Sequence, residues 1–408
     1  MPRGEKYKFS TFFTQGQYET QVETLEVVGK NEGALIGILK EDFNLENRVA
    51  LVPNSIRTIV GYGHRIVVES DAGKKARYSD DDYADAGAKV TKSKSEVLKC
   101  EIIIKSSPLS VEEIDQLHGG QIVFTMLPLP LITKAYLEKL KEKRVIALAL
   151  DYFQNQDGSF PALRIMGEMA GRIAIQTASE LLSIYSGGRG VLLGGVSGVP
   201  PTKVLILGAG VVGQYAAQTA IGLGAAVRIF DNDINKIIRL QDKIGRQLHT
   251  SSINPKYLAY QLTSADVVVS AMHGKKGRAP VLVTEEMVSN MKEGSVIIDV
   301  SIDQGGCIET SEMTTHKNPT FVKHGVIHYC VPNMASKVPR TSSLAISNVI
   351  TPAILGLASP ARLVDLLYGN QGLLRGIYAY DGHITNQYLA NHFELKYTAL
   401  ELLLTSSQ

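Results

Sequence analysis

The chain has 408 residues, of which 44% are hydrophobic and 20% charged, and its formal net charge is +2. This length predicts about two or three domains, and the small net charge excludes a field that would recruit nucleic acid or an anionic membrane. No apolar stretch is long enough to span a bilayer, and the polar N-terminus lacks a signal-peptide core. The scattered cysteines, Cys100, Cys307 and Cys330, have no metal-like spacing, so we expect a cytoplasmic protein with reduced thiols and no metal site.

Short apolar runs alternate with amphipathic segments along most of the chain. Residues 1–33 are polar and poorly periodic, and we expect an N-terminal extension there. Strands are expected in chain order at residues 35–39, 64–69, 102–105, 121–126, 145–150, 204–207, 226–230, 267–270, 295–300 and 326–329. Helices are expected at residues 54–61, 132–142, 166–185, 355–367 and 397–404. Such alternation is typical of α/β folds with parallel sheets and crossover helices.

Residues 204–231 read VLILGAGVVGQYAAQTAIGLGAAVRIFD and combine a strand, a glycine turn and a helix. Gly208 would permit the sharp turn, Gly210 would let the backbone approach a pyrophosphate, and Gly213 would let helix and strand pack closely. Asp231 ends the second strand, near the position from which an acidic residue accepts hydrogen bonds from the adenosine ribose. Because a carboxylate there repels a 2′-phosphate, the motif predicts NAD rather than NADP. The neighbouring residues expected to line the same cofactor site are Val211, Val212 and Asn232.

Two later loops carry polar side chains after predicted strands. The first reads VSIDQGGC and the second CVPNM. Ligands bind at the carboxyl ends of strands in open α/β sheets, so Asp303 is the candidate acid/base residue, with a turn-capping aspartate as the alternative. Asn333 is expected beside the nicotinamide or the substrate, with Met334 next to it, although a turn asparagine explains the loop almost as well. Arg48 offers the planar fork that suits a carboxylate, unless it is an ordinary surface arginine.

These segments resemble alanine dehydrogenase in order and separation. The likeness runs from about residue 34 to the C-terminus and rests on LKEDFNLENRVALVP, MGEMAGRIA, LGAGVVGQ, APVLVTEEMV, IDQGGCIETSEMTTH, VIHYCVPNMASKVPRTS and YDGH. The chain is thus similar to the alanine dehydrogenase and transhydrogenase-α superfamily, and closer to the former. The resemblance implies an NAD-dependent oxidoreductase that interconverts L-alanine with pyruvate and ammonia. It also implies two doubly wound, Rossmann-like α/β domains around a closing cleft, and commonly a homohexamer.

The resemblance assigns roles to three of the candidates. Arg48 would hold the substrate carboxylate, Asp303 would serve proton transfer near the amine, and Asn333 would lie by the nicotinamide. We expect residues 34–163 together with 341–408 to form the substrate domain, and residues 164–340 to form an inserted NAD-binding domain.

Two positions depart from the family pattern. The family strand Lys-Val-Lys-Glu-Pro reads IKSSP here, with Ser107 at the second lysine, and the family Leu-His-Leu reads LPL, with Pro128 at the catalytic histidine. A proline can neither donate nor carry a proton. Candidate substitutes are Lys105, which lies two residues before Ser107 on the same strand face, and His273, which follows a strand of the nucleotide domain. The alternatives are a structural lysine and a solvated loop histidine.

Two other functions therefore remain open. One is an NAD-dependent opine-type or other imine reductase with a different substrate. The other is a catalytically weak NAD-binding protein that senses the cofactor or assembles with a partner. Intact Arg48, Asp303 and Asn333 favour chemistry, whereas the missing lysine and histidine argue against the standard reaction.

Overall fold

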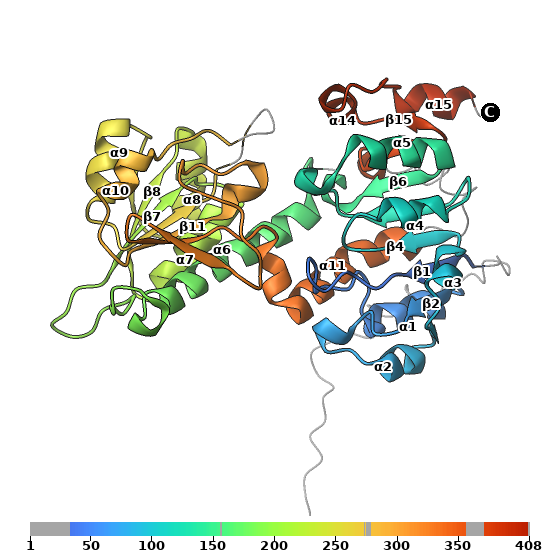
Figure 1. The fold of residues 1–408 in the computed structure, drawn as a ribbon, viewed down its shortest axis with the longest axis horizontal. Helices are drawn as coiled ribbons and strands as arrows, with labels where there is room; N and C mark the ends of the chain where they lie inside the picture. The colour runs from blue at the N-terminus through green and yellow to red at the C-terminus, as the bar shows by residue number, and fades with distance from the viewer. Residues whose placement is uncertain (1–32, 156, 273, 275–278, 356–370, 407–408) are drawn as a thin grey trace, which may run out of the picture.

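The protein forms two lobes, each built on its own sheet with helices on both faces (Figure 1). The computed structural model describes residues 33–155, 157–272, 274, 279–355 and 371–406. All but the last residue of the expected N-terminal extension, and nearly all of the helix expected at residues 355–367, lie outside these ranges. Two helices, α6 (Pro161–Leu181) and α11 (Pro339–Leu355), run between the lobes.

The first lobe contains an eight-stranded sheet in the order β15-β14-β6-β5-β4-β1-β2-β3. The strands from β3 to β6 are parallel, and the hairpin β14-β15 adds antiparallel to β6. The strands are β1 (Leu35–Ile38), β2 (Arg65–Glu69), β3 (Lys89–Thr91), β4 (Ile102–Ile104), β5 (Ile122–Thr125), β6 (Ile146–Ala149), β14 (Ile377–Tyr380) and β15 (His383–Ile384). The helices are α1 (Pro53–Gly61), α2 (Asp80–Asp85), α3 (Lys94–Leu98), α4 (Val111–Asp115), α5 (Lys134–Lys143), α13 (Gln371–Leu374), α14 (Gln387–His392) and α15 (Leu400–Ser406).

The second lobe contains a seven-stranded sheet in the order β12-β13-β11-β10-β7-β8-β9. Its strands are parallel except for β12, which pairs antiparallel with β13. The strands are β7 (Lys203–Leu207), β8 (Ala226–Phe230), β9 (His249–Ser251), β10 (Val267–Ser270), β11 (Val296–Asp299), β12 (Thr320–Lys323) and β13 (Val326–Tyr329). The helices are α7 (Val211–Gly222), α8 (Ile234–Ile244), α9 (Pro255–Leu262) and α10 (Glu285–Ser289).

Both sheets are doubly wound, which confirms the predicted fold class. Strand order reverses between β1 and β4 in the first lobe and between β7 and β10 in the second. The central strands β4, β10 and β11 are buried throughout, because helices cover both faces of each sheet. Loops at the carboxyl ends of the strands beside each reversal form the crevice where such folds bind ligands.

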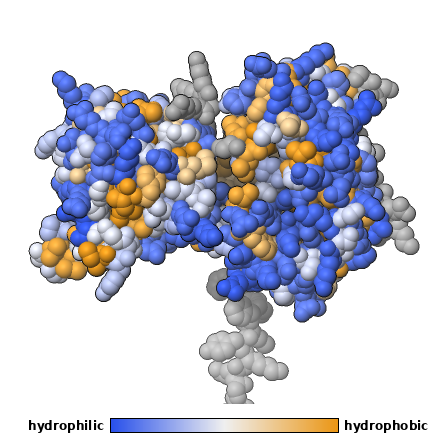
Figure 2. All heavy atoms as spheres, in the orientation of Figure 1, coloured by the Kyte–Doolittle hydropathy of each residue, from blue (hydrophilic) through white to orange (hydrophobic). Residues whose placement is uncertain are grey.

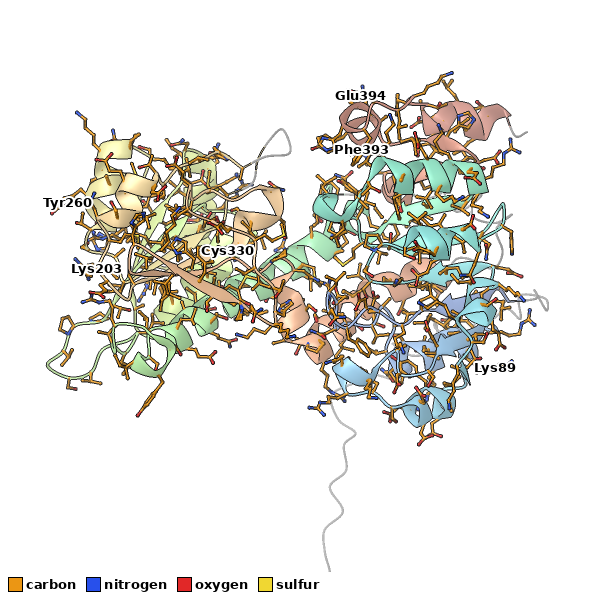
Figure 3. All side chains as sticks on the ribbon, viewed as in Figure 1. Lys89, Lys203, Tyr260, Cys330, Phe393 and Glu394 are labelled. Carbon is orange, nitrogen blue, oxygen red and sulfur yellow. The ribbon has the colours of Figure 1, made fainter. Side chains whose placement is uncertain are left out.

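The sequence predicts reduced cysteines and no stretch long enough to span a bilayer. Cys100, Cys307 and Cys330 are all buried and unpaired, and Cys330 lies inside the second lobe (Figure 3). No helix among the described residues is both long and apolar enough to cross a bilayer.

The glycine turn between β7 and α7 has the geometry that its sequence predicts. Gly208 has a φ of +112° and donates its N–H to the carbonyl of Phe230 at 2.7 Å. A Cβ at Gly213 would lie 1.8 Å from the carbonyl oxygen of Gly208. A Cβ at Gly210 would meet nothing within 4 Å, so the backbone there is open to an incoming group. The glycines therefore make the turn, leave space above it and bring helix against strand.

Gly213→Ala should destabilise the protein, since the new methyl group must push α7 away from the turn. We expect a loss of about 1–3 kcal/mol, typical of overpacking, measured as a lower midpoint of thermal unfolding by circular dichroism. Gly222→Ala is the matched control, because a Cβ at Gly222, on the same helix, meets nothing within 4 Å. That variant should be neutral or more stable by up to about 1 kcal/mol. Equal midpoints for Gly213→Ala and the wild type would contradict the packing role.

Candidate functional site

Glu41, which follows β1, is hydrogen bonded to the serines that follow β4, at the point where the strand order of the first sheet reverses. The amide of Ser106 donates to Glu41 Oε1 at 2.5 Å, and the amide of Ser107 donates to both carboxylate oxygens at 3.3 Å. The hydroxyl of Ser107 donates to Glu41 Oε2. Glu41 is only 4% exposed. The position where the family is expected to carry a lysine therefore holds a hydroxyl that is already bound to a buried carboxyl group.

Glu41 carries an unusual charge state for a glutamate. Burial, aided by the negative charge of Glu46, raises its pKa from 4.5 to about 7, while Lys105 and the hydrogen bonds from Ser107 and Ser106 oppose the rise. Burial outweighs these lowering contributions. Near neutral pH, Glu41 is therefore protonated in a large fraction of molecules.

Arg48 is buried beside Glu46 in a two-pronged ion pair. Its Nε donates to Glu46 Oε1 at 2.8 Å and its Nη2 to Glu46 Oε2 at 2.5 Å. The remaining nitrogen, Nη1, donates to the sulfur of Met166 at 3.1 Å, and a thioether is a weak acceptor. Arg48 thus retains donor capacity that a substrate carboxylate can use.

Glu46 also links the first lobe to the second. Asn333 Nδ2 donates to Glu46 Oε2 at 2.5 Å, and the amide of Asn47 donates to the hydroxyl of Ser336 at 2.8 Å. Asn333 adopts the left-handed conformation, with φ of 55°, which asparagine tolerates better than most residues. Met334 is 4% exposed and belongs to the core of the second lobe. Asn333 therefore lies at the contact between the lobes, whereas the side chain of Met334 packs inward.

Asp303 lies on the second-lobe wall of this contact, in the short helix η6 (Val300–Gln304) that follows β11. Asp303 is exposed to solvent, although the protein around its carboxyl group still desolvates it in part. This desolvation raises the pKa of Asp303 to about 6, with a backbone hydrogen bond from Asn333 and the charge of Arg48 opposing it and the charges of Asp299 and Asp151 adding to it. A carboxyl with this pKa can exchange a proton near neutral pH.

Asp151 lies on the first-lobe wall, in the short helix η4 (Leu150–Tyr152) after β6. Its Oδ2 accepts the amide of Leu127 at 2.7 Å, whereas its buried Oδ1 has no hydrogen-bond partner in the described part of the chain. Burial raises the pKa of Asp151, and the Leu127 amide and the charge of Arg48 oppose this rise. Pro128 is the residue after Leu127 and leads into η3 (Leu129–Leu131), which packs against η6 of the other lobe.

Of the two candidate substitutes for the missing lysine and histidine, only Lys105 lies within the described residues. Lys105 is 6% exposed, and its ammonium pairs at 2.8 Å with Glu113. Glu113 also pairs with Lys94 and caps the start of α4 through Ser110. This arrangement favours a structural role for Lys105. His273 lies outside the described residues.

The cofactor candidates gather around the glycine turn of the second lobe. Asp231 follows β8 and is 4% exposed. Its Oδ2 accepts the amide of Ala209 at 2.7 Å and its Oδ1 that of Asp233 at 2.8 Å, so the carboxylate is fixed beneath the turn. Val211 and Val212 form the first turn of α7, against α6, and Asn232 is an exposed neighbour of Asp231.

Three residues of this site were not singled out from the sequence. Glu41 and Asp151 each follow a buried strand, which is the same signal that identified Asp303, and Glu46 is near enough to Arg48 to pair with it. Together with Arg48 and Asp303 they form one electrostatic cluster that spans both lobes. Figure 2 shows the surface furrow between the lobes.

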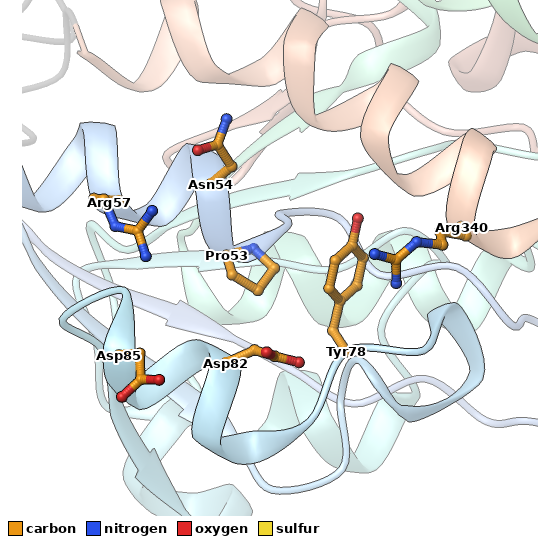
Figure 4. A pocket seen from close by; sticks show the side chains of 7 residues that line it. All are labelled: Pro53, Asn54, Arg57, Tyr78, Asp82, Asp85 and Arg340. Carbon is orange, nitrogen blue, oxygen red and sulfur yellow. The ribbon is translucent and has the colours of Figure 1, made fainter. Parts of the chain in front are cut away.

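Another hollow, of about 280 Å³, lies away from this cluster between α1, α2 and the start of α11 (Figure 4). Arg340 stacks on Tyr78 at 4.4 Å and donates to the carbonyl of Arg77, and Asp82 caps α2. Because these charges already have partners, we assign the hollow no ligand. No group of three or more His, Cys, Asp or Glu residues in the described ranges could hold a metal ion.

Comparison with known proteins agrees with the motifs. The N-terminal domain model of alanine dehydrogenase/PNT matches residues 37–170, and the C-terminal domain model matches residues 174–387. Alanine dehydrogenase 2 of Staphylococcus aureus strain USA300 is 41% identical over 367 residues, which cover 90% of this chain and 98% of the relative.

Solved structures extend the comparison. An L-alanine dehydrogenase superposes with a TM-score of 0.83 at 36% identity, covering 88% of this chain and 99% of the other. A transhydrogenase from Sinorhizobium meliloti, at 24% identity and a TM-score of 0.73, shares the fold over 86% of this chain and 99% of its own. Since both domain models match and a relative aligns over nearly its whole length, the chain belongs to the alanine dehydrogenase/PNT family.

Proposed function

We propose that the protein is an NAD-dependent oxidoreductase that interconverts L-alanine, or a closely related amino acid, with its 2-oxo acid and ammonia. The observation that carries this proposal is the placement of Arg48 and Asp303 in one electrostatic cluster, although they come from different lobes. A carboxylate anchor and an acid/base group are the two functions that amino-acid oxidation needs beside a hydride acceptor. Family membership and the similarity to alanine dehydrogenases support the same reaction.

We infer that the substrate carboxylate binds at Nη1 of Arg48. Glu46 holds the other side of the guanidinium and fixes its plane, so binding requires little reorganisation. Asp303, opposite, would remove the proton that the substrate ammonium must lose before oxidation. Asn333 would orient Asp303 through its backbone amide and lie by the nicotinamide ring.

The residues of the second lobe fit NAD. The open space above Gly210 admits a diphosphate at the start of α7, where backbone N–H groups are free. Asp231 lies at the end of β8, where its carboxylate would accept the ribose hydroxyls and repel a 2′-phosphate. Val211, Val212 and Asn232 would line this site. When bound, NAD⁺ supplies the acceptor for the hydride from the substrate Cα.

We also propose that Ser107 and Pro128 replace the family's lysine and histidine and reshape the substrate side of the cleft. Removing one preorganised electrostatic contact costs about 2.7–4 kcal/mol in barrier, so alanine turnover should be slow unless other groups compensate. Lys105 and His273 remain candidates for that role. A different 2-oxo acid or an imine as substrate is the second candidate function, favoured by the hydroxyl of Ser107 on Glu41.

We further propose a domain and assembly scheme. Residues 34–163 with 341–408 would form the substrate domain and residues 164–340 the inserted NAD-binding domain, which the division of strands between the two sheets supports. A cytoplasmic homo-oligomer, a hexamer by the family resemblance, completes the scheme.

An NADH-oxidation screen over 2-oxo acids with ammonia, and with amino acids as amine donors, tests the function directly. Pyruvate or a close relative should support turnover. Asp303→Asn should lower kcat by about 10²–10⁴, because it removes the ionisable group at nearly the same shape, while NADH affinity changes little. Reaction only with amino acids as amine donors would indicate the imine reductase. No turnover with any substrate would indicate the cofactor sensor, and an active Asp303→Asn enzyme would exclude Asp303 as the acid/base group.

The cofactor preference follows from Asp231. NAD(H) should bind at least tenfold more tightly than NADP(H), since the Asp231 carboxylate at the end of β8 would repel a 2′-phosphate on the adenosine ribose. Isothermal titration calorimetry with both cofactors measures the ratio. Asn232→Ala is a useful control, because it leaves the charge in place and should preserve the preference. Similar affinities for both cofactors would show that Asp231 does not meet the ribose.

The raised pKa of Glu41 predicts a pH-dependent stability. The folded protein keeps the Glu41 proton up to about pH 7, whereas the unfolded chain releases it near 4.5. The folded state therefore binds more protons in this window, and its stability falls as pH rises, by about 1.4 kcal/mol for each unit of pKa difference.

Glu41→Gln isolates this contribution, because it keeps an acceptor for the Ser106 amide but cannot ionise. Urea denaturation between pH 5 and pH 8 should show wild-type stability declining relative to the variant. Ser107→Lys, which supplies a nearby cation, should reduce the decline. Parallel pH profiles for the wild type and Glu41→Gln would mean that Glu41 ionises normally.

A further inference from the structure

The first-lobe wall of the cleft contains a buried carboxylate oxygen that lacks a partner. Asp151 is 9% exposed, and its Oδ1 has no hydrogen-bond partner among the described residues. A buried polar atom without a partner destabilises the folded state, and most buried polar atoms in native proteins have a partner. The position of Oδ1 therefore requires an explanation.

The place of Asp151 in the site suggests why its Oδ1 has no partner. The other oxygen of Asp151 is held by the amide of Leu127 at 2.7 Å, which places the carboxyl group beside Pro128. Pro128 is the position at which the family resemblance expects the catalytic histidine. Proline has neither an N–H nor a titratable group, so residue 128 cannot satisfy the neighbouring carboxylate or carry a proton.

The charged and titratable groups around Asp151 suit proton exchange. Arg48 favours the ionised form of Asp151, and the charge of Asp151 raises the pKa of Asp303 on the opposite wall. Tyr152, on the same short helix, is held in its neutral form by burial and by the charge of Asp151, which raise its pKa. The contact between η3 and η6 keeps the two walls close.

We propose that Asp151 performs the proton transfer for which the family uses its histidine, acting through the free Oδ1. This inference rests on the proposed amino-acid oxidation and names a further catalytic residue for it. Asp303 would remove the proton from the substrate ammonium, and Asp151 would serve the water that hydrolyses the product.

The proton balance of this step is complete. Once the Cα hydride has left, the substrate is an iminium ion. As the oxygen of a water molecule bonds to the iminium carbon, one O–H bond breaks and Asp151 Oδ1 receives the proton. Asp151 then returns this proton to the substrate nitrogen. The C–N bond breaks, the hydroxyl proton passes to the departing ammonia, and the products are a 2-oxo acid and ammonium.

Asp151→Asn tests the proposal, because the amide keeps the shape and can still accept the Leu127 N–H. With the best substrate from the screen, kcat should fall by about 10²–10⁴ and the acidic limb of its pH profile should shift. NADH affinity and thermal stability should stay close to those of the wild type. Asp266→Asn is the control for loss of a buried carboxylate away from the cleft: Asp266 lies at the amino end of β10, accepts the amide of Lys203 and pairs with Lys292 and Arg189, so this variant should keep the wild-type kcat and pH profile even if it is less stable.

A rescue experiment separates catalysis from structure. Pro128 has φ of −67° and ψ of 112°, which a histidine adopts without strain. Pro128→His in the Asp151→Asn background should therefore recover at least tenfold in kcat. No recovery, or an Asp151→Asn enzyme with unchanged kcat and pH profile, overturns the role of Asp151 and leaves the proposed function intact. A wild-type protein that turns over no amino acid or 2-oxo acid overturns both.

Discussion

The buried carboxylate of Glu46 is the interaction on which the site depends. It accepts three hydrogen bonds from Arg48, through the backbone amide, Nε and Nη2, and a fourth from Asn333 of the other lobe. Charge pairing of this kind tolerates burial only when the geometry and the remaining hydrogen bonds are good. Ser343 and Ser347 of α11 extend the arrangement by accepting the amides of Val49 and Val52. Glu46 therefore sets the orientation of Arg48 and supplies one of the contacts between the lobes.

The second constraint on the site is that acidic side chains outnumber the cations around them. Glu41, Glu46, Asp151 and Asp303 influence one another around Arg48, while the ammonium of Lys105 pairs with Glu113. With too few cations to neutralise every carboxylate, the raised pKa values of Glu41, Asp151 and Asp303 all originate in burial. A lysine at position 107 would supply the missing charge. In its absence the hydroxyl of Ser107 and the amides of Ser106 and Ser107 hold Glu41.

Local rules explain what the sequence could predict. The glycine turn obeys steric requirements within a few residues, so the sequence predicts the turn at Gly208 and the close packing at Gly213. Runs such as III and VVVS predicted buried parallel strands for the same reason. The partners of Glu41 and Asn333 are different, because they lie 66 and 287 residues away in the chain. Only the order of the strands brings these groups together, and the unsatisfied oxygen of Asp151 can be recognised only once every neighbour is placed.

The two helices that run between the lobes determine how the cleft can open. A helix resists bending, so α6 would act as a stiff strut, and any opening would be a rotation of whole lobes about its ends, whereas Pro352 interrupts the hydrogen bonds of α11. The contacts from Glu46 to Asn333 and from Asn47 to Ser336 lie directly before the start of α11, close to that axis. In a rotation of this kind, residues near the axis move little, whereas residues at the outer edges of the lobes move far. Arg48 and Asn333 would thus keep a nearly constant separation through the cycle, and the large excursions would fall to the outer edges of the lobes, where substrate enters and product leaves.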